Sequence, residues 1–318
     1  MYDKEIQFNQ CCLNGRIVMP PMATNKSIDG TINESLCMYY AERSMNPHVN
    51  LIITEHAFVC TSGKASKGQI SAQEDSCIQG YRKIASMVHY NSKAKIFAQI
   101  SHAGGNANVN ANGGVLYAPS EYIYKGNQAR EITHEQMDYI KNQFAEAAAR
   151  IKKAGFDGVE IHGAHGYLLN QFFSPLTNHR TDEYGPQSIS NRMRYITEVV
   201  KTVRQAVGND FAISYRFGGE DYTAGGSTLE DAVAGAKLLE QAGVDLISVS
   251  GGILGTTRKH HDEPGYFSDQ SEAIKKAVQI PVLLTGGVKN IEQADILLKE
   301  EKADLIGIGR ALLVNPNL

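Results

Sequence analysis

One stretch of this chain reads Gly158-Val159-Glu160-Ile161-His162-Gly163-Ala164-His165-Gly166-Tyr167. It begins with a short β-branched run after the helix-ending Ala154-Gly155, which predicts a buried strand. His162 and His165 then come just past the carboxyl end of that strand, with Tyr167 two residues on. Catalytic groups gather at that edge in parallel α/β folds, and two imidazoles with a phenol can hold a substrate oxygen and supply a proton. We therefore predict a catalytic site here, although a single histidine is more often a packing residue.

Apolar, β-rich runs alternate with amphipathic helical patterns along the whole chain. The predicted strands are Arg16–Met22, Asn50–Val59, Ala94–Ser101, Gly158–His162, Phe211–Phe217, Leu246–Val249, Val282–Thr285 and Leu305–Ile308. Helical spacing of apolar residues predicts helices over Glu135–Ala154, Asn191–Val207, Leu229–Ala242 and Ile291–Leu298, several of them ending at glycine.

Eight successive βα units without a Gly/Ser-rich linker predict an α/β protein, a (β/α)8 TIM barrel forming a single domain over residues 1–318. The alternative is a doubly wound open sheet, but no G-x-G-x-x-G follows the first strand. Two insertions, residues 104–133 and 163–190, are longer than ordinary connections. Because long βα loops of a barrel cover its active-site face, we expect both to be active-site loops.

The composition excludes several classes of protein. The chain has 318 residues, a net charge of -3 and no apolar run long enough to span a bilayer, which argues against nucleic-acid and membrane partners. The start of the chain lacks the apolar core of a signal peptide. Five cysteines without a C-x-x-C pair indicate reduced thiols in a cytoplasmic protein, and no spacing of residues indicates a metal site.

Glycines cluster at the ends of the last three predicted strands. They lie in Ser250-Gly251-Gly252, Thr285-Gly286-Gly287 and Gly307-Ile308-Gly309-Arg310. Such glycines let backbone N–H groups approach an anion, and Arg310 adds a charge suited to bidentate binding. The loops after strands seven and eight are the usual phosphate position of barrels, so we predict a phosphate site rather than tight turns alone. The spacing leaves open whether the phosphate belongs to a cofactor or to a substrate.

Six motifs in order make the chain resemble the Old Yellow Enzyme family of flavin mononucleotide (FMN) oxidoreductases over essentially its whole length. They are Arg16-Ile17-Val18-Met19-Pro20-Pro21-Met22, Gln99-Ile100-Ser101-His102-Ala103-Gly104, Glu160 to Leu168, Ser174 to Gly185, Asn191-Arg192 and Gly307-Ile308-Gly309-Arg310. The chain is most similar to the bacterial branch with NADH:flavin oxidoreductases and the flavin domain of 2,4-dienoyl-CoA reductases.

The resemblance implies a role for each matching residue. Pro21, Met22 and Ala23 would line the isoalloxazine ring, while Gln99 and Arg216 would face its pyrimidine edge. The phosphate would be held by Gly251, Gly252, Gly286, Gly287, Gly309 and Arg310. His162 and His165 would bind a substrate carbonyl oxygen, and Tyr167 would donate a proton. For Arg216 and Gln99 the plainer alternatives are a surface ion pair and a polar residue that closes a strand.

The implied reaction is ping-pong: NADH or NADPH passes hydride through flavin N5 to an activated alkene, an α,β-unsaturated carbonyl. The expected partner is a small-molecule substrate, and a homo-oligomer is left open. An amine dehydrogenase or demethylase on the same barrel, a phosphate-binding lyase or aldolase, and a flavin-binding protein without ene-reductase turnover are the alternatives.

Two departures from the family pattern matter. Ala23 stands where many members carry Cys or Thr, so a side-chain donor to the flavin is missing. The chain ends at Leu318 without a cysteine-rich motif, so we expect no iron–sulfur cluster and no second domain.

Overall fold

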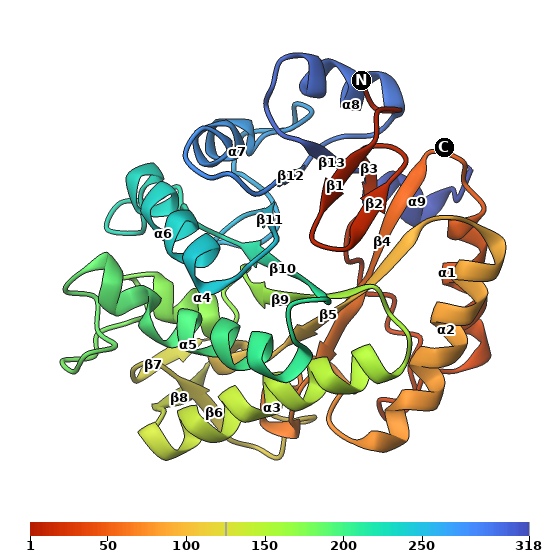
Figure 1. Ribbon diagram of the computed structural model, residues 1–318. Coiled ribbons are helices and arrows are strands. Elements are labelled where there is room, and N and C mark those ends of the chain that lie inside the picture. The colour runs from red at the N-terminus through yellow and green to blue at the C-terminus, as the bar shows by residue number, and fades with distance from the viewer. Residues whose placement is uncertain (125, 318) are drawn as a thin grey trace.

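A computed structural model describes residues 1–124 and 126–317 and shows a closed barrel of eight parallel strands (Figure 1). Around the barrel the strand order is β10-β11-β12-β13-β3-β4-β5-β9. The strands are β3 (Ile17–Met19), β4 (Val49–Phe58), β5 (Lys95–Ser101), β9 (Gly158–Gly163), β10 (Ala212–Phe217), β11 (Leu246–Val249), β12 (Val282–Thr285) and β13 (Leu305–Gly307). The predicted single-domain (β/α)8 barrel is confirmed, and all eight predicted strands are present.

The first barrel strand is shorter than predicted. β3 ends at Met19, three residues before the predicted end at Met22. Pro20 and Pro21 follow, and a proline has no N–H to donate to a neighbouring strand, so the ladder cannot continue through them. The segment from Pro20 to Ala23 instead leaves the barrel at the carboxyl end of β3.

Helices surround the barrel in Figure 1. The four predicted helices are confirmed as α3 (His134–Lys153), α5 (Ile189–Val207), α6 (Leu229–Ala242) and α8 (Ile291–Lys299). The others are α1 (Glu34–Ser44), α2 (Ile78–Asn91), α4 (Leu168–Phe173), α7 (Ser268–Lys275) and α9 (Arg310–Val314), with three short 3-10 turns, η1 (Thr61–Gly63), η2 (Asp75–Cys77) and η3 (Gly104–Asn106). Within the described part of the chain, none combines the length and apolarity needed to cross a membrane.

A hairpin plugs one end of the barrel. β1 (Ile6–Phe8) and β2 (Cys11–Leu13) form an antiparallel pair before the first barrel strand. Three hairpin side chains and one inward-facing layer of the barrel share a single apolar cluster: Phe8, Cys11, Leu13, Val18, Leu51, Ile53, Phe97, Ala212, Leu246, Leu283 and Leu305. Most of these barrel residues lie at or near the amino ends of their strands, so the hairpin closes that end and leaves the carboxyl ends for a site.

The two long loops are built against each other. The first contains a three-stranded sheet of β6 (Leu116–Ala118), β8 (Asn127–Glu131) and β7 (Tyr122–Tyr124). Arg180 of the second loop donates from Nη1 to the carbonyls of Pro119 and Ile132, at 3.1 and 2.8 Å, and pairs with Asp182. This buried network joins the loops. The ligand atoms of His134, Asp182 and Glu183 also lie within 4.8 Å of one another, but Asp182 is already bonded to Arg180 and His134.

Candidate active site

The turn after β9 brings the three predicted catalytic side chains together. His165 and Gly166 both have left-handed backbone, with φ of 58° and 71°, which reverses the chain and starts α4 directly after Tyr167. As a result the Tyr167 ring lies 4.6 Å from the ring of His162, centroid to centroid. A left-handed histidine is strained by about 1 kcal/mol, and such strain is typical of functional sites.

His162 and His165 are linked through their imidazoles. His162 Nε2 lies 3.1 Å from His165 Nδ1, and His165 Nε2 lies 2.7 Å from Ser250 Oγ. Burial lowers the pKa of both rings well below the ordinary value. The charges of Arg216 and His56 lower both further, and His165 also lowers the pKa of His162. Both rings are therefore neutral at pH 7. His162 Nδ1 is buried with no partner among the described residues, so it offers an unused hydrogen-bonding atom.

Arg216 lies in the mouth of the barrel, only 6% exposed. Its guanidinium donates to the hydroxyls of Ser248, Ser250 and Thr285 at 3.1, 3.0 and 2.9 Å. These partners are neutral, and Arg216 Nε has no partner among the described residues. The alternative of a surface ion pair is therefore wrong. A continuous hydrogen-bonded chain runs from Arg216 through Ser250 and His165 to His162.

Gln99 belongs to a buried polar layer just beneath this chain. Its Nε2 donates to Glu160 Oε1 at 2.8 Å, and Ser214 Oγ donates to Glu160 Oε2 at 2.9 Å. Burial raises the pKa of Glu160, while the charge of Arg216 opposes that rise. Because the amide nitrogen is bonded to Glu160, the Gln99 carbonyl remains as the acceptor. Gln99 thus lies within the barrel rather than closing a strand end.

A hollow of about 260 Å³ opens beside His165 and Arg216. It brings together most of the predicted cofactor residues and several unpredicted ones: Pro20, Pro21, Met22, Ala23, His165, Arg216, Ser250, Thr256, Thr257, Tyr266, Thr285, Gly286, Gly287, Val288, Gly307, Gly309 and Arg310. Gly286 and Gly287 have φ of 117° and 75°, and a Cβ on Gly286 would lie 2.7 Å from the Tyr266 ring. Glycine is therefore required at this part of the wall.

Two predicted phosphate residues lie slightly apart from this hollow. Gly251 and Gly252 line a neighbouring one that also includes Asp221 and Arg258. The Gly251 carbonyl accepts a hydrogen bond from His165 N at 3.2 Å. A Cβ on Gly251 would lie 1.9 Å from the carbonyl oxygen of Gly255. These glycines therefore shape the backbone behind His165.

The sequence interpretation missed His56. This residue lies near the carboxyl end of β4, and its Nε2 is 3.2 Å from the Tyr167 hydroxyl oxygen. Its ring is 6.3 Å from that of His162. The signal was a histidine near the carboxyl end of a predicted barrel strand, because catalytic groups gather at that end of the barrel.

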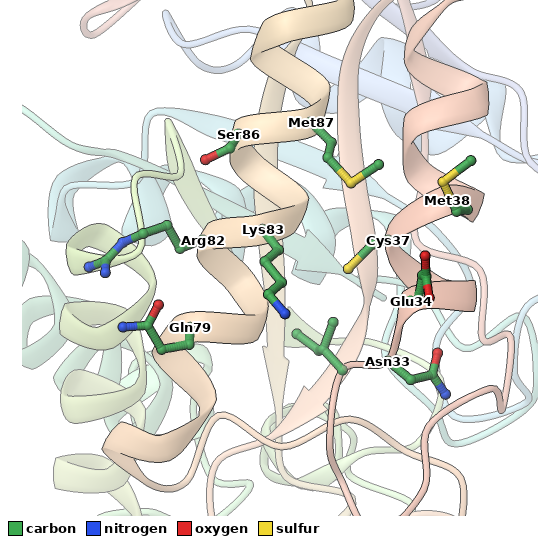
Figure 2. A pocket seen from close by; sticks show the side chains of 10 residues that line it. Asn33, Glu34, Cys37, Met38, Gln79, Arg82, Lys83, Ser86 and Met87 are labelled. Atoms are coloured by element: carbon green, nitrogen blue, oxygen red, sulfur yellow. The ribbon is translucent and has the colours of Figure 1, made fainter.

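Another hollow, of about 680 Å³, lies far from these groups in the outer helical layer (Figure 2). Figure 2 shows Cys37 and Met38 of α1 facing Lys83 and Met87 of α2 across it. It contains none of the residues at the carboxyl ends of the barrel strands. The convergence of histidines, tyrosine and arginine therefore identifies the smaller hollow as the candidate active site.

Comparison with known proteins shows which family has this fold and site. The model of the NADH:flavin oxidoreductase / NADH oxidase family matches residues 4–318. The chain belongs to this family. It is 40% identical over 313 residues to an NADH oxidase of Thermoanaerobacter brockii, a match that covers 96% of this chain and 48% of the relative. The chain therefore spans about half the length of that relative.

Other members of the NADH:flavin oxidoreductase family match along most of their own length. An NADPH dehydrogenase of Bacillus subtilis (strain 168) is 36% identical over 318 residues, covering 98% of this chain and 90% of the relative. The solved structure of the old yellow enzyme homologue from Zymomonas mobilis aligns with a TM-score of 0.84 at 27% identity, covering 99% of this chain and 90% of that one. The resemblance to the Old Yellow Enzyme family is thus confirmed.

The hollow fits the FMN that this family implies. Backbone at Gly286, Gly287 and Gly309, with Arg310 at the start of α9, suits a phosphate. Arg216 Nε, which has no partner among the described residues, suits an acceptor on a flavin pyrimidine edge. Gln99 does not line the hollow itself; it lies beside Glu160, to which its amide nitrogen is bonded. Ala23 lines the hollow without a side-chain donor, as the sequence indicated.

Proposed function

We propose that this chain is an FMN-dependent NAD(P)H oxidoreductase that reduces an activated alkene, an α,β-unsaturated carbonyl. The observation that carries the proposal is the linked set His162, His165 and Tyr167 beside a glycine-lined hollow containing Arg216. Family membership supports the flavin and nicotinamide parts. The alkene is our addition, based on the chemistry of the side chains.

Bound FMN would supply hydride transfer between NADH or NADPH and the alkene. Pro21, Met22 and Ala23 would line its ring. Gly286, Gly287, Gly309 and Arg310 would hold its phosphate, with Gly251 and Gly252 behind them. The cation of Arg216 and the Gln99 carbonyl would face the pyrimidine edge, where a positive charge balances negative charge that collects there.

His162 and His165 would bind the substrate carbonyl oxygen. Both are neutral at pH 7 and each carries one N–H, which is shared within the His162–His165–Ser250 chain and would turn to the substrate oxygen when it binds. Negative charge grows on this oxygen as hydride arrives, and fixed donors stabilise it in the manner of an oxyanion hole, by a few kcal/mol each. Tyr167 would then give its phenol proton to the α-carbon.

The first test is an anaerobic absorbance titration of the purified protein with NADH, followed by 2-cyclohexenone. We expect the flavin band to bleach with NADH and return with the enone. His162→Ala and His165→Ala should each slow the return by about a hundredfold, since one lost oxyanion donor costs about 3 kcal/mol. FMN should remain bound in both variants.

Other outcomes would contradict the proposal in distinct ways. If air restores the bleached flavin band but the enone does not, dioxygen is the electron acceptor and the alkene is not the substrate. A colourless protein that cannot be reconstituted with FMN would overturn the flavin assignment altogether.

A further inference from the structure

His56 reaches the site because β4 carries an irregularity. Thr54 pairs with Ala98 of β5, whereas Ala57 pairs with Ile100, so β4 has one extra residue between these points. A bulge of this kind re-aims side chains and is frequent beside active sites. Here it separates two neighbours: Glu55 accepts from Thr24 Oγ1 at 2.7 Å, while the ring of His56 faces Tyr167.

Tyr167 lies between two imidazoles. Its ring is 4.6 Å from that of His162 and 5.7 Å, edge to face, from that of His56. Of the two, His56 contacts the phenol oxygen, with its Nε2 at 3.2 Å. Burial lowers the pKa of His56 to about 4, so at neutral pH this ring carries a single N–H. Either Nε2 donates that hydrogen to the phenol, or Nε2 accepts the phenol proton.

We infer that His56 is a positioning residue for Tyr167 and donates its Nε2–H to the phenol oxygen. This inference rests on the proposed function, in which Tyr167 protonates the substrate. With this contact filled by the His56 hydrogen, the Tyr167 O–H is not held by His56. An acceptor at His56 would instead hold the phenol proton away from the substrate.

In the proposed step, one proton moves from Tyr167 to the substrate. The Tyr167 O–H bond breaks while a C–H bond forms at the α-carbon of the substrate enolate, and the O–H electron pair stays on the phenol oxygen. His56 Nε2–H stabilises this phenolate, because hydrogen bonds to an ionised acceptor are about twice as strong as neutral ones. A proton from water then restores the phenol.

The kinetic test separates the two half-reactions of the FMN-loaded protein by anaerobic stopped flow. In His56→Leu we expect reduction by NADH to stay within about twofold, and reoxidation by 2-cyclohexenone to slow by about tenfold or more. His56→Gln, which keeps an N–H donor, should restore most of that rate. In a Tyr167→Phe background, His56→Leu should cause no further slowing. Equal slowing in both backgrounds would overturn the inference.

A second measurement needs neither FMN nor turnover. 3-Fluorotyrosine at position 167 ionises at a milder pH than tyrosine, and its ¹⁹F signal reports the ionisation directly. Because a donor favours the phenolate, His56→Leu should raise the ionisation pH by about one unit, and His56→Gln should not. An unchanged or lowered value in His56→Leu would show that His56 does not donate.

The two measurements fail separately. If the reduced wild-type protein does not react with the enone, the proposed function falls, and the fluorine titration still decides whether His56 donates to Tyr167. If wild-type turnover is normal but the ¹⁹F titration shows no effect of His56, only the inference about His56 falls.

Discussion

Glu160 determines which way the Gln99 amide faces. The carboxylate accepts from Gln99 Nε2 on one oxygen and from Ser214 Oγ on the other, and it is fully buried. An amide at position 160 could present either an oxygen or a nitrogen to Gln99, so it could not fix the Gln99 carbonyl as the acceptor that the proposed function assigns to it. A buried polar group must keep its partners, because an unmade hydrogen bond costs about 1–3 kcal/mol.

We predict that Glu160→Gln weakens FMN binding about tenfold and lowers the free energy of unfolding by about 2 kcal/mol. The matched control is Ser214→Ala, which removes another hydrogen-bond partner of Glu160 and leaves the bond to Gln99. That variant should lose about 1 kcal/mol of stability and retain wild-type affinity. Fluorescence titration of the apoprotein with FMN and urea unfolding measure the two effects. Equal weakening of FMN binding in both variants would refute the role given to Glu160.

Individual site residues were predictable where a side chain suited to catalysis stands at the carboxyl end of a predicted strand. The motif around His162 identified His162, His165 and Tyr167, which the structure brings together. His56 could not be paired with Tyr167 in advance, because the two are 111 residues apart and meet only through an irregularity in β4. Nothing in the local sequence marks the extra residue that β4 carries relative to β5.

At the scale of elements, the hairpin β1–β2 and the site occupy opposite ends of the barrel. The hairpin contributes Phe8, Cys11 and Leu13 to the lower apolar cluster, and the ring of Phe8 lies 6.4 Å from that of Phe97, edge to face. Its function is packing, since residues at the amino-terminal face of a barrel serve stability and those at the carboxyl face serve chemistry.

We therefore expect Phe8→Ala to lower the free energy of unfolding by about 3 kcal/mol through loss of buried area and an unfilled cavity. The rates of both half-reactions at a temperature where the variant is folded should match wild type. Phe8→Leu, which retains most of the apolar volume, should cost about half as much. Urea denaturation and stopped flow give the two readings. If Phe8→Ala had normal stability but slow half-reactions, the two ends of the barrel would not divide stability and chemistry in this way.

Elements with strong periodicity were predicted well, and those without it were not. The helix Leu229–Ala242 was predicted with its observed bounds from its apolar spacing and the glycine that follows it. In the structure Thr228 and Asp231 form a capping box at its start, and Gly243 ends it in left-handed backbone. The three-stranded sheet within residues 104–133 was missed. Its strands are three to five residues long, too short to show alternation, and they are held by Arg180 from a loop 50 residues away.

Over the whole molecule, buried neutral histidines make stability depend on pH. Burial lowers the pKa of His56 to about 4 and that of His102 to about 3, and those of His162 and His165 also fall well below 6.5. For His102 the geometry agrees: Nδ1 accepts from Gly104 N at 3.0 Å, so a proton there would break that bond. The unfolded chain therefore binds more protons than the folded one below pH 6.5.

The free energy of unfolding falls as the pH falls, because protons bind more tightly to these histidines in the unfolded chain. These depressed values stabilise the fold fully above about pH 6.5, and that contribution is lost as the pH falls toward 4 and then 3. Each ring contributes up to about 1.4 kcal/mol per pH unit in this range. We predict that the free energy of unfolding drops by several kcal/mol between pH 7 and pH 5. His102→Asn, although less stable at pH 7, should show a smaller drop. Urea unfolding measures the free energy of unfolding of both proteins at each pH. If its pH dependence were the same in wild type and in His102→Asn, His102 would not contribute to the drop.

The hollow beside Arg216 also has a consequence for the order of events during synthesis. Its wall joins residues 20–23 to Gly307, Gly309 and Arg310, which are synthesised later, and they meet because β13 pairs with β3 to close the barrel. During synthesis the early residues must wait until nearly three hundred later ones have left the ribosome. A flavin bound here would therefore join two segments that are far apart in the sequence, and the yellow colour would mark molecules whose barrel has closed.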